Sequence, residues 1–158
     1  GRPKAPLIYD ATPKDFAFGK ADELRAGTDV TIIANGMLVG AALVAADRMA
    51  KDGISARVLN MATVKPLDDD AVRRAAAETG CIVVAEEHLI HGGLGSAVAQ
   101  AAARLHPCAI EFVGLDDKYA ESGDPEALMR KYGLTSNEVE NAARRLLGRT
   151  QRTATLQA

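Results

Sequence analysis

The sequence predicts an α/β domain with a largely parallel sheet and helices on both faces. Short apolar or β-branched runs alternate with helical patterns along most of the chain, which is typical of strands joined by helices in βαβ units. The length of 158 residues suits one domain with a single full-sized core. Four of the apolar runs are predicted strands of this sheet: 30–34, 55–61, 81–85 and 110–113.

Three predicted helices connect these strands. The turn Asn35-Gly36 leads into a helix over 37–51, which is apolar almost all round and therefore predicts a covered position at an interface. Asp68 is the predicted N-cap of the second helix, because Asp accepts hydrogen bonds from free backbone N–H groups at a helix start. The third helix is rich in Ala and is predicted over 96–105.

The two ends of the chain differ from its alternating middle. Residues 1–14 contain three prolines, which predicts an extended arm that continues from another domain. A fifth strand is predicted at 15–19. Asp124-Pro125 predicts a short helix through Lys131, and the capping-box spacing from Thr135 to Glu138 opens the last helix. Residues 148–158 show no hydrophobic periodicity, which predicts a disordered tail. The domain is therefore expected over 15–147.

Composition excludes some classes of function. The chain has 19 Lys and Arg residues against 21 Asp and Glu, a net charge of -2, and no basic block that would neutralise nucleic-acid phosphates. No apolar run reaches the roughly 18–20 residues of a membrane span, and no leader-like pattern opens the chain, so we expect a cytoplasmic protein. Cys81 and Cys108 border apolar runs and are expected to be reduced thiols packed in strands.

Candidate functional residues lie in loops at the predicted carboxyl edge of the sheet. Gly93 and Gly95 begin a dinucleotide-like pattern, but Val98 stands where that pattern needs a third small residue, so a nicotinamide site is disfavoured. Such glycines still allow close backbone approach, either to pack against a neighbouring domain or to offer helix N–H groups to an anion or a carboxylate. His88 and His91 lack the spacing of a metal site. We expect these histidines to contact a partner or a substrate channel.

Several stretches taken together resemble the C-terminal domain of transketolases. The similarity covers about residues 1–147 and is greatest to the C-terminal subunit of split, two-chain transketolases. Related domains end the beta subunit of 2-oxo acid dehydrogenases and deoxyxylulose-phosphate synthase. The stretches that carry the resemblance are 27–36, 63–68, 86–88 with 92–96, and 121–123 with 132–135.

This resemblance implies a three-layer α/β/α domain with a mostly parallel five-stranded sheet, in which one strand, expected at 16–19, is antiparallel. It also implies two-carbon ketol transfer between sugar phosphates by thiamine diphosphate and Mg²⁺, both held by other domains of the enzyme. The sequence contains no Gly-Asp-Gly pattern followed by Asn, which holds the metal diphosphate in this family. The chain alone is therefore expected to be inactive and to need thiamine diphosphate-binding domains, or an N-terminal transketolase subunit, in a homo-oligomer or heterotetramer.

The resemblance also implies roles for individual residues. Arg2 matches an arginine that helps to bind the phosphate of a sugar substrate, and an ordinary linker arginine is the alternative. No residue of the chain is expected to be catalytic or to bind cofactor or metal. The residues expected at an interface or channel loop are Lys65, Glu87, His88, His91, Gly92 and Gly93.

Two other functions stay open on the sequence alone. The domain could be an assembly module that docks a partner, as in the 2-oxo acid dehydrogenase beta subunit, or it could close a deoxyxylulose-phosphate synthase. A free-standing flavodoxin-like protein is a further alternative, which predicts flavin colour in the purified material. The sequence encoded upstream of Gly1 would distinguish an enzyme from a docking module.

Overall fold

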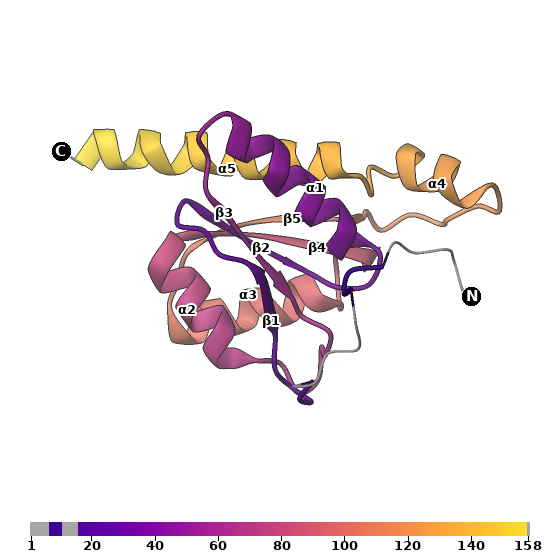
Figure 1. Cartoon of the computed structure of the whole chain (residues 1–158), viewed down its shortest axis with the longest axis horizontal. Coiled ribbons are helices and arrows are strands. Elements are labelled where there is room, and N and C mark those ends of the chain that lie inside the picture. The colour runs from indigo at the N-terminus through magenta and orange to yellow at the C-terminus, as the bar shows by residue number, and fades with distance from the viewer. Residues whose placement is uncertain (1–6, 11–15, 158) are drawn as a thin grey trace.

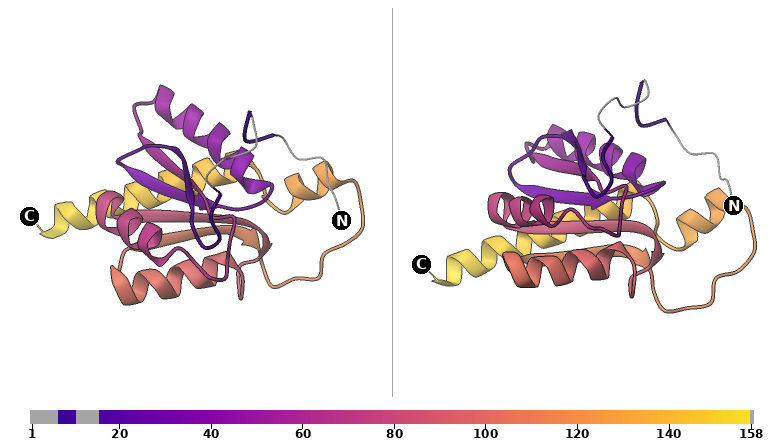
Figure 2. Two further views of the ribbon diagram at one scale, coloured as in Figure 1. Left: turned by 60° about the horizontal axis from the view of Figure 1, so that its bottom comes forward. Right: turned by 90° about the horizontal axis from the view of Figure 1, so that it is seen from below.

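A five-stranded sheet forms the middle layer of the domain, with helices on both faces (Figures 1 and 2). The computed structural model describes residues 7–10 and 16–157, with side chains described as far as Thr150. The elements in chain order are β1 (Asp22–Arg25), β2 (Val30–Ala34), α1 (Leu38–Lys51), β3 (Ala56–Asn60), α2 (Asp69–Thr79), β4 (Cys81–Leu89), α3 (Leu94–Leu105), β5 (Ala109–Leu115), α4 (Pro125–Lys131) and α5 (Ser136–Gln157).

The sheet has the strand order β1-β3-β2-β4-β5. Strand β3 is parallel to β2, β2 to β4, and β4 to β5, whereas β1 runs antiparallel to β3 at one edge. This confirms the predicted mostly parallel sheet with one antiparallel strand and a three-layer α/β/α architecture. Among the described residues, no helix is both long and apolar enough to cross a bilayer.

Alternate side chains of the buried strands supply two cores, one on each face of the sheet. Ile32 and Val83 point toward α1 and α5, whereas Ile33 and Val84 point toward α2 and α3. Because successive side chains of a strand point to opposite faces, continuous apolar runs are required where both faces are covered. The strands 30–34 and 81–85 have this pattern, which explains why the sequence located them.

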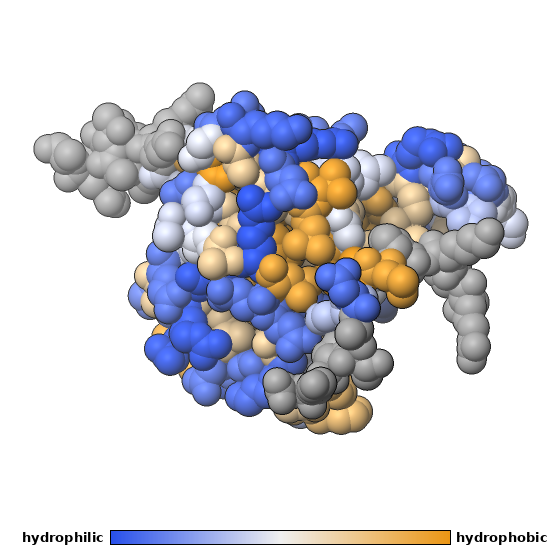
Figure 3. Space-filling view, in the orientation of Figure 1, coloured by the Kyte–Doolittle hydropathy of each residue, from blue (hydrophilic) through white to orange (hydrophobic). Residues whose placement is uncertain are grey.

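Helix α1 is apolar on most sides because this domain itself covers it. Six of its residues are buried between the sheet and α5, which packs beside it: Leu38, Val39, Ala42, Ala45, Ala46 and Met49. Val44 remains 44% exposed. Figure 3 shows apolar side chains gathered in the middle of the face that carries α1. Packing against the sheet and α5 thus explains the buried side of α1, whereas Val44 lies on its exposed side.

The predicted helix caps are confirmed. The Asp68 side chain accepts a hydrogen bond from the backbone N–H of Ala71 at the start of α2, and Gly80 ends this helix with a φ of 70°. Asp124 caps α4 in the same way through the N–H of Ala127. At α5 the Thr135 hydroxyl accepts from the N–H of Glu138.

The antiparallel strand is β1 at Asp22–Arg25, so the expectation of a strand at 16–19 is wrong. Residues 16–19 instead lead into a turn, in which the Lys20 N–H donates to the carbonyl of Ala17 and Gly19 has a φ of 73°. The Phe16 and Phe18 rings contact each other edge to face, and the Phe18 side chain is 81% exposed. The alternating aromatic residues therefore have no sheet to pair with.

Two further elements extend beyond their predicted ends. Strand β4 continues to Leu89, because its pairing with β5 resumes at Leu89 and Leu115 after an irregularity. Helix α5 continues to Gln157, whereas we predicted a tail from 148. Gly148 is tolerated inside this helix, and the next turn is held by the Thr150 hydroxyl, which donates to backbone carbonyls of the preceding turn. The predicted arm over 1–14 lies mostly outside the described residues.

Both cysteines are free thiols in apolar surroundings, as predicted. Cys81 begins β4 and is buried, and its thiol donates to the carbonyl oxygen of Asp29 at 3.4 Å. Burial raises the pKa of the Cys81 thiol to about 11, and burial also raises the pKa of Cys108, which precedes β5. Neither thiol is therefore activated as a nucleophile at neutral pH.

Candidate functional site

The candidate functional site lies at the carboxyl edge of the sheet, where β2, β3 and β4 end. The chain leaves β2 through α1 toward β3 and leaves β4 through α3 toward β5, so the connections diverge between the adjacent strands β2 and β4. The helices α1 and α3 also lie on opposite faces of the sheet (Figure 2). Open α/β sheets bind their ligands in the crevice at such a topological switch point.

Glu86 connects the three elements that meet at this switch point. Its Oε1 accepts a hydrogen bond from Asn35 Nδ2 at 3.0 Å, just after β2. Its Oε2 accepts from the backbone N–H of Leu94 at 2.6 Å, at the start of α3. The carboxylate thus satisfies one of the free N–H groups of α3 and interacts favourably with the positive end of that helix.

The glycines before α3 lie close to this carboxylate. A Cβ atom at Gly93 would be 2.2 Å from Glu86 Oε2 and 2.7 Å from His88 Nδ1, so a larger residue would displace these side chains. Gly92 has a φ of 87°, and its N–H donates to the Ser96 hydroxyl at 2.8 Å. His88 also contacts the carbonyl oxygen of Leu89 through Nδ1 at 2.9 Å. The glycine loop is therefore packed against the end of β4.

The loop that contains Lys65 is held by a different set of contacts. Asp68 accepts from the N–H of Ala21 at 3.0 Å, and Thr63 Oγ1 accepts from the N–H of Gly19 at 3.3 Å. Lys65 itself is exposed. Along the chain this loop joins β3 to α2, and these hydrogen bonds attach it to the segment that leads into β1. The loop is therefore held at the edge of the sheet farthest from β5.

The segment 7–10 is held at the same edge through Tyr9. The Tyr9 hydroxyl donates to Asp22 Oδ2 at 2.6 Å and accepts from Asn60 Nδ2 at 2.8 Å. Burial and the hydrogen bond to the Asp22 carboxylate raise the pKa of the Tyr9 hydroxyl, because both favour its neutral form. The incoming chain is thereby attached to β1 and to the end of β3.

A hollow of about 420 Å³ lies between this segment and the switch point. Ile8, Asn35, Asn60 and Glu87 are among the residues that line it. A second, more apolar hollow of about 450 Å³ extends from Glu87 under α4, where Leu128 and other apolar residues line it. Glu87 is exposed and borders both hollows.

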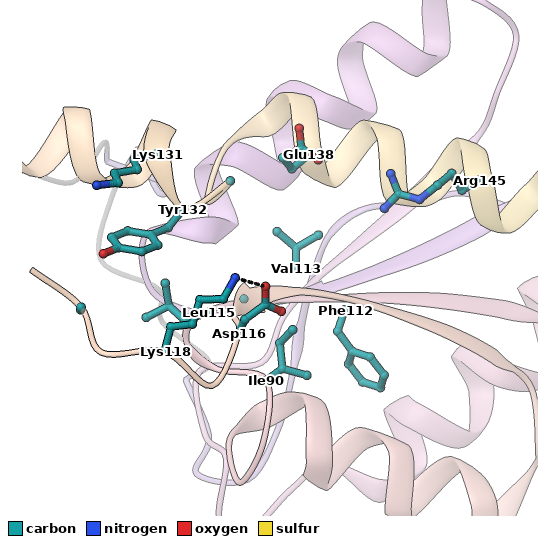
Figure 4. A pocket seen from close by; sticks show the side chains of 13 residues that line it. Ile90, Phe112, Val113, Leu115, Asp116, Lys118, Lys131, Tyr132, Glu138 and Arg145 are labelled. Atoms are coloured by element: carbon teal, nitrogen blue, oxygen red, sulfur yellow. Dashed lines mark hydrogen bonds and ion pairs between the residues drawn. The ribbon is translucent and has the colours of Figure 1, made fainter.

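A hollow of about 680 Å³ lies beside the edge strand β5 and is bordered by α4 and α5 (Figure 4). Its cationic groups are already paired with carboxylates. Lys118 is 3.4 Å from Asp116, Arg145 is 3.0 Å from Glu111, and Lys131 pairs with Glu121. This surface therefore presents mixed charge and not a field that would attract an anion.

The structure brings together only part of the predicted set of site residues. Glu87, His88 and the glycines Gly92 and Gly93 lie around the end of β4, and His91 is exposed in the turn that follows. His88 lies in the extended part of β4 and not in a loop, which corrects the prediction of a loop from 86 onward. Lys65 belongs to the separate loop after β3, and Arg2 lies outside the described residues.

Sequence reasoning missed Glu86 and Asn35 as a connected pair. The signal was present in the alternation of β4, because Ile82 and Val84 face α3, and Glu86 continues that face by two residues. Its partner Asn35 belongs to a turn far away in sequence. Only the pairing of β2 with β4 shows that the two side chains meet.

The described residues do not fit a metal diphosphate. No group of three or more His, Cys, Asp or Glu side chains comes together in the described part of the chain in a way that could hold a metal ion. The carboxylate of Glu86, which lies closest to a helix start, is already bonded to Asn35 and Leu94.

Comparison with known proteins identifies the family. A model of the transketolase C-terminal domain matches residues 19–139, which is more than half of the chain. The chain belongs to the transketolase C-terminal domain family. A solved structure described as a split-gene transketolase, an inactive beta4 tetramer, is 40% identical, with a TM-score of 0.87 over 91% of this chain and 47% of that chain.

Curated relatives of this transketolase C-terminal domain include enzymes that are named for different reactions. A 6-deoxy-6-sulfo-D-fructose transketolase subunit of Clostridium sp. (strain MSTE9) is 46% identical over 85% of this chain and 42% of its own length. A 1-deoxy-D-xylulose-5-phosphate synthase of Heliobacterium modesticaldum is 43% identical over 81% of this chain and 20% of its own length. The chain thus spans less than half the length of these relatives.

Proposed function

We propose that this chain is the C-terminal part of a thiamine diphosphate-dependent transketolase that transfers a two-carbon ketol unit between sugar phosphates. The main support for the proposal is the structural similarity to the split-gene transketolase, which extends over 91% of this chain but only 47% of the transketolase chain. The remainder of the enzyme would supply the cofactor site, since the described residues lack a donor set for it. Thiamine diphosphate would supply the carbanion chemistry there.

In this proposal the domain contributes contacts to the assembled enzyme. The residues expected at that interface or channel are Lys65, Glu87 and the end of β4 with its glycine turn. The position of these residues supports this role, because they lie at the carboxyl edge, where open α/β sheets present their functional loops. Arg2 would bind substrate phosphate through a bidentate guanidinium contact.

Reconstitution of the activity tests this division of labour. The chain would be mixed with sugar phosphates, thiamine diphosphate and Mg²⁺, with and without the thiamine diphosphate-binding subunit or domains encoded beside it. We expect no ketol transfer by the chain alone and transfer by the assembled enzyme, measured as aldose release. Turnover by the purified chain alone would contradict the proposal.

A second candidate function is that of a 1-deoxy-D-xylulose-5-phosphate synthase, because one such enzyme is 43% identical to this chain. The same reconstituted enzyme, supplied with pyruvate as well as sugar phosphates, distinguishes the two candidates, because a 1-deoxy product needs a two-carbon donor that carries a methyl group. Formation of 1-deoxy-D-xylulose 5-phosphate, detected by mass spectrometry, would favour the synthase. Ketol transfer between sugar phosphates without that product would favour the transketolase.

A further inference from the structure

The crevice between β2 and β4 has features of an anion site. The connections from the two strands diverge there, and the Leu94 N–H at the start of α3 donates to a side chain of β4. Helix starts at such positions bind phosphates and carboxylates, because their N–H groups and the helix dipole favour negative charge. In this chain the group found in that position is a carboxylate of the protein itself.

We propose that Glu86 is an internal ligand that occupies the hydrogen-bond donors at the start of α3 in place of an external anion. Both of its oxygens are used: Oε2 accepts from the Leu94 N–H at 2.6 Å, and Oε1 accepts from Asn35 Nδ2 at 3.0 Å. One carboxylate therefore joins the end of β4 to the turn after β2 and to the start of α3. This inference concerns the domain itself and does not depend on the proposed enzymatic activity.

The residue at 93 supports this role independently. Gly93 has a φ of -95° and a ψ of -154°, an extended conformation that any residue can adopt, so backbone freedom does not require glycine there. The absence of a side chain is what matters, because a Cβ at residue 93 would lie 2.2 Å from Glu86 Oε2. The loop thus leaves room for the bound carboxylate beside the helix start, as it would for an exogenous anion.

The arrangement makes Glu86 a positioning residue for the end of β4 and the glycine turn. His88 lies on the same side of Gly93 as the carboxylate, since a Cβ there would also be 2.7 Å from His88 Nδ1. Loss of the carboxylate would remove the hydrogen-bond acceptor of both the Leu94 N–H and the Asn35 side chain. It would also open a crevice whose donors suit a small carboxylate ion.

Acetate rescue of Glu86→Ala is the test. Acetate supplies the carboxylate and the carbon that this substitution removes, so it can occupy the vacated crevice. We expect Glu86→Ala to lower the melting temperature of the chain by roughly 5–10 °C, since two hydrogen bonds to a charged acceptor are lost. Acetate should raise the melting temperature of this variant in a saturable way, and the neutral analogue acetamide should not.

Three controls separate occupancy from general salt effects. The wild-type chain and Glu86→Gln should show no such response, because the side chain of residue 86 still occupies the place that acetate would take. Glu87→Ala is the matched neighbour, since Glu87 is the adjacent exposed carboxylate, whereas the Asn35 and Leu94 donors bind Glu86. An equal effect of acetate on Glu86→Ala and Glu87→Ala would overturn the proposal, as would a melting temperature of Glu86→Ala equal to that of wild type.

Gly93→Ala gives a second line of evidence. Its methyl group would displace the carboxylate, so we expect it to lower the melting temperature more in the wild-type chain than in the Glu86→Ala background. An equal loss in both backgrounds would overturn the proposal. If Glu86→Ala does not fold, Glu86→Gln decides the question, because an amide can accept at one partner only. Wild-type stability of that variant would then contradict the role of Glu86.

Discussion

At the scale of single residues, Asp68 shows how one buried carboxylate stabilises two parts of the fold. One oxygen caps α2 through the Ala71 N–H, and the other accepts from the Ala21 N–H just before β1. Burial alone would raise the pKa of Asp68, but these two hydrogen bonds and the positive charge of Lys20 bring it below the ordinary value of 3.8. The charged form is therefore the one that the fold stabilises.

Replacing Asp68 should destabilise the domain more than removing an ordinary cap. We expect Asp68→Ala to lower the free energy of unfolding by about 2–4 kcal/mol, because a helix cap and a contact to a second segment are both lost. Asp124→Ala is the matched control, since Asp124 caps α4 through one N–H and is exposed, and should cost about 1 kcal/mol. Equal losses in urea unfolding would contradict the double role.

The contribution of Asp68 should also depend on pH. Because its folded-state pKa is lowered, its stabilisation is fully present above the unfolded pKa and is lost as pH falls through the folded-state value. The difference in unfolding free energy between wild type and Asp68→Asn should therefore be constant above about pH 5 and shrink below about pH 4. A difference that grows on acidification would contradict this assignment.

Arg2 leads to a prediction about substrate binding in the complete enzyme. If its guanidinium binds a sugar phosphate, Arg2→Ala should raise the KM for phosphorylated sugars by about ten-fold or more and leave the KM for unphosphorylated sugars nearly unchanged. Steady-state kinetics with both kinds of substrate measure this. The same effect on both kinds would remove Arg2 from the phosphate site.

At the scale of elements, ion pairs from α5 to β5 span the glycine inside this helix. Glu111 of β5 pairs with Arg145 at 3.0 Å and with Arg149 at 3.3 Å, on successive turns of the helix. These pairs lie on both sides of Gly148, which has the lowest helix propensity in this part of α5. The sequence pattern weakens at that glycine, whereas the contacts to the edge strand continue.

Gly148→Ala should therefore stabilise the domain. A Cβ at this position meets nothing within 4 Å, and alanine loses less conformational freedom than glycine on entering a helix. We expect a gain of about 0.5–1 kcal/mol in the free energy of unfolding. Gly53→Ala is the matched control, because that position is equally open but has a φ of 78°, so alanine should destabilise it. A loss of stability in Gly148→Ala would argue against a helix through this residue.

At the scale of the whole molecule, the two edges of the parallel strands have different surroundings. The carboxyl edge carries the two hollows that border Glu87, together with the turn at 90–93, whereas the amino edge carries short connections such as the one at Asp52–Gly53. If the first edge faces the rest of a transketolase, assembly should protect it selectively.

Hydrogen exchange measures this protection. When the thiamine diphosphate-binding part is added, backbone amides over 89–93 should exchange several-fold more slowly, because solvent access and local opening both fall. Amides at Asp52 and Gly53 should exchange at the same rate with and without the partner. Protection at the amino edge alone would place the interface elsewhere.

Much of the fold was predictable because its signals are local. The buried strands 30–34 and 81–85 are continuous apolar runs, and Asp68, Asp124 and Thr135 mark helix starts within three residues of the N–H groups that they cap. The strand expected at 16–19 had the right alternation, but it lacked a neighbour. Which segment pairs with β3 at the sheet edge is decided by chain geometry and not by a local pattern.

The sequence by itself determined the alternation of strands and helices over 30–113 and the glycine turn before α3, since each depends on residues close together along the chain. It also determined the family, through short motifs that keep their order along the chain. The tertiary structure alone decided that Asn35, Glu86 and the Leu94 N–H meet at one point. Two of these groups follow strands that become neighbours only through the parallel pairing of β2 and β4. Hydrogen bonds act over about 3 Å, so a contact between distant segments exists only once the sheet has formed.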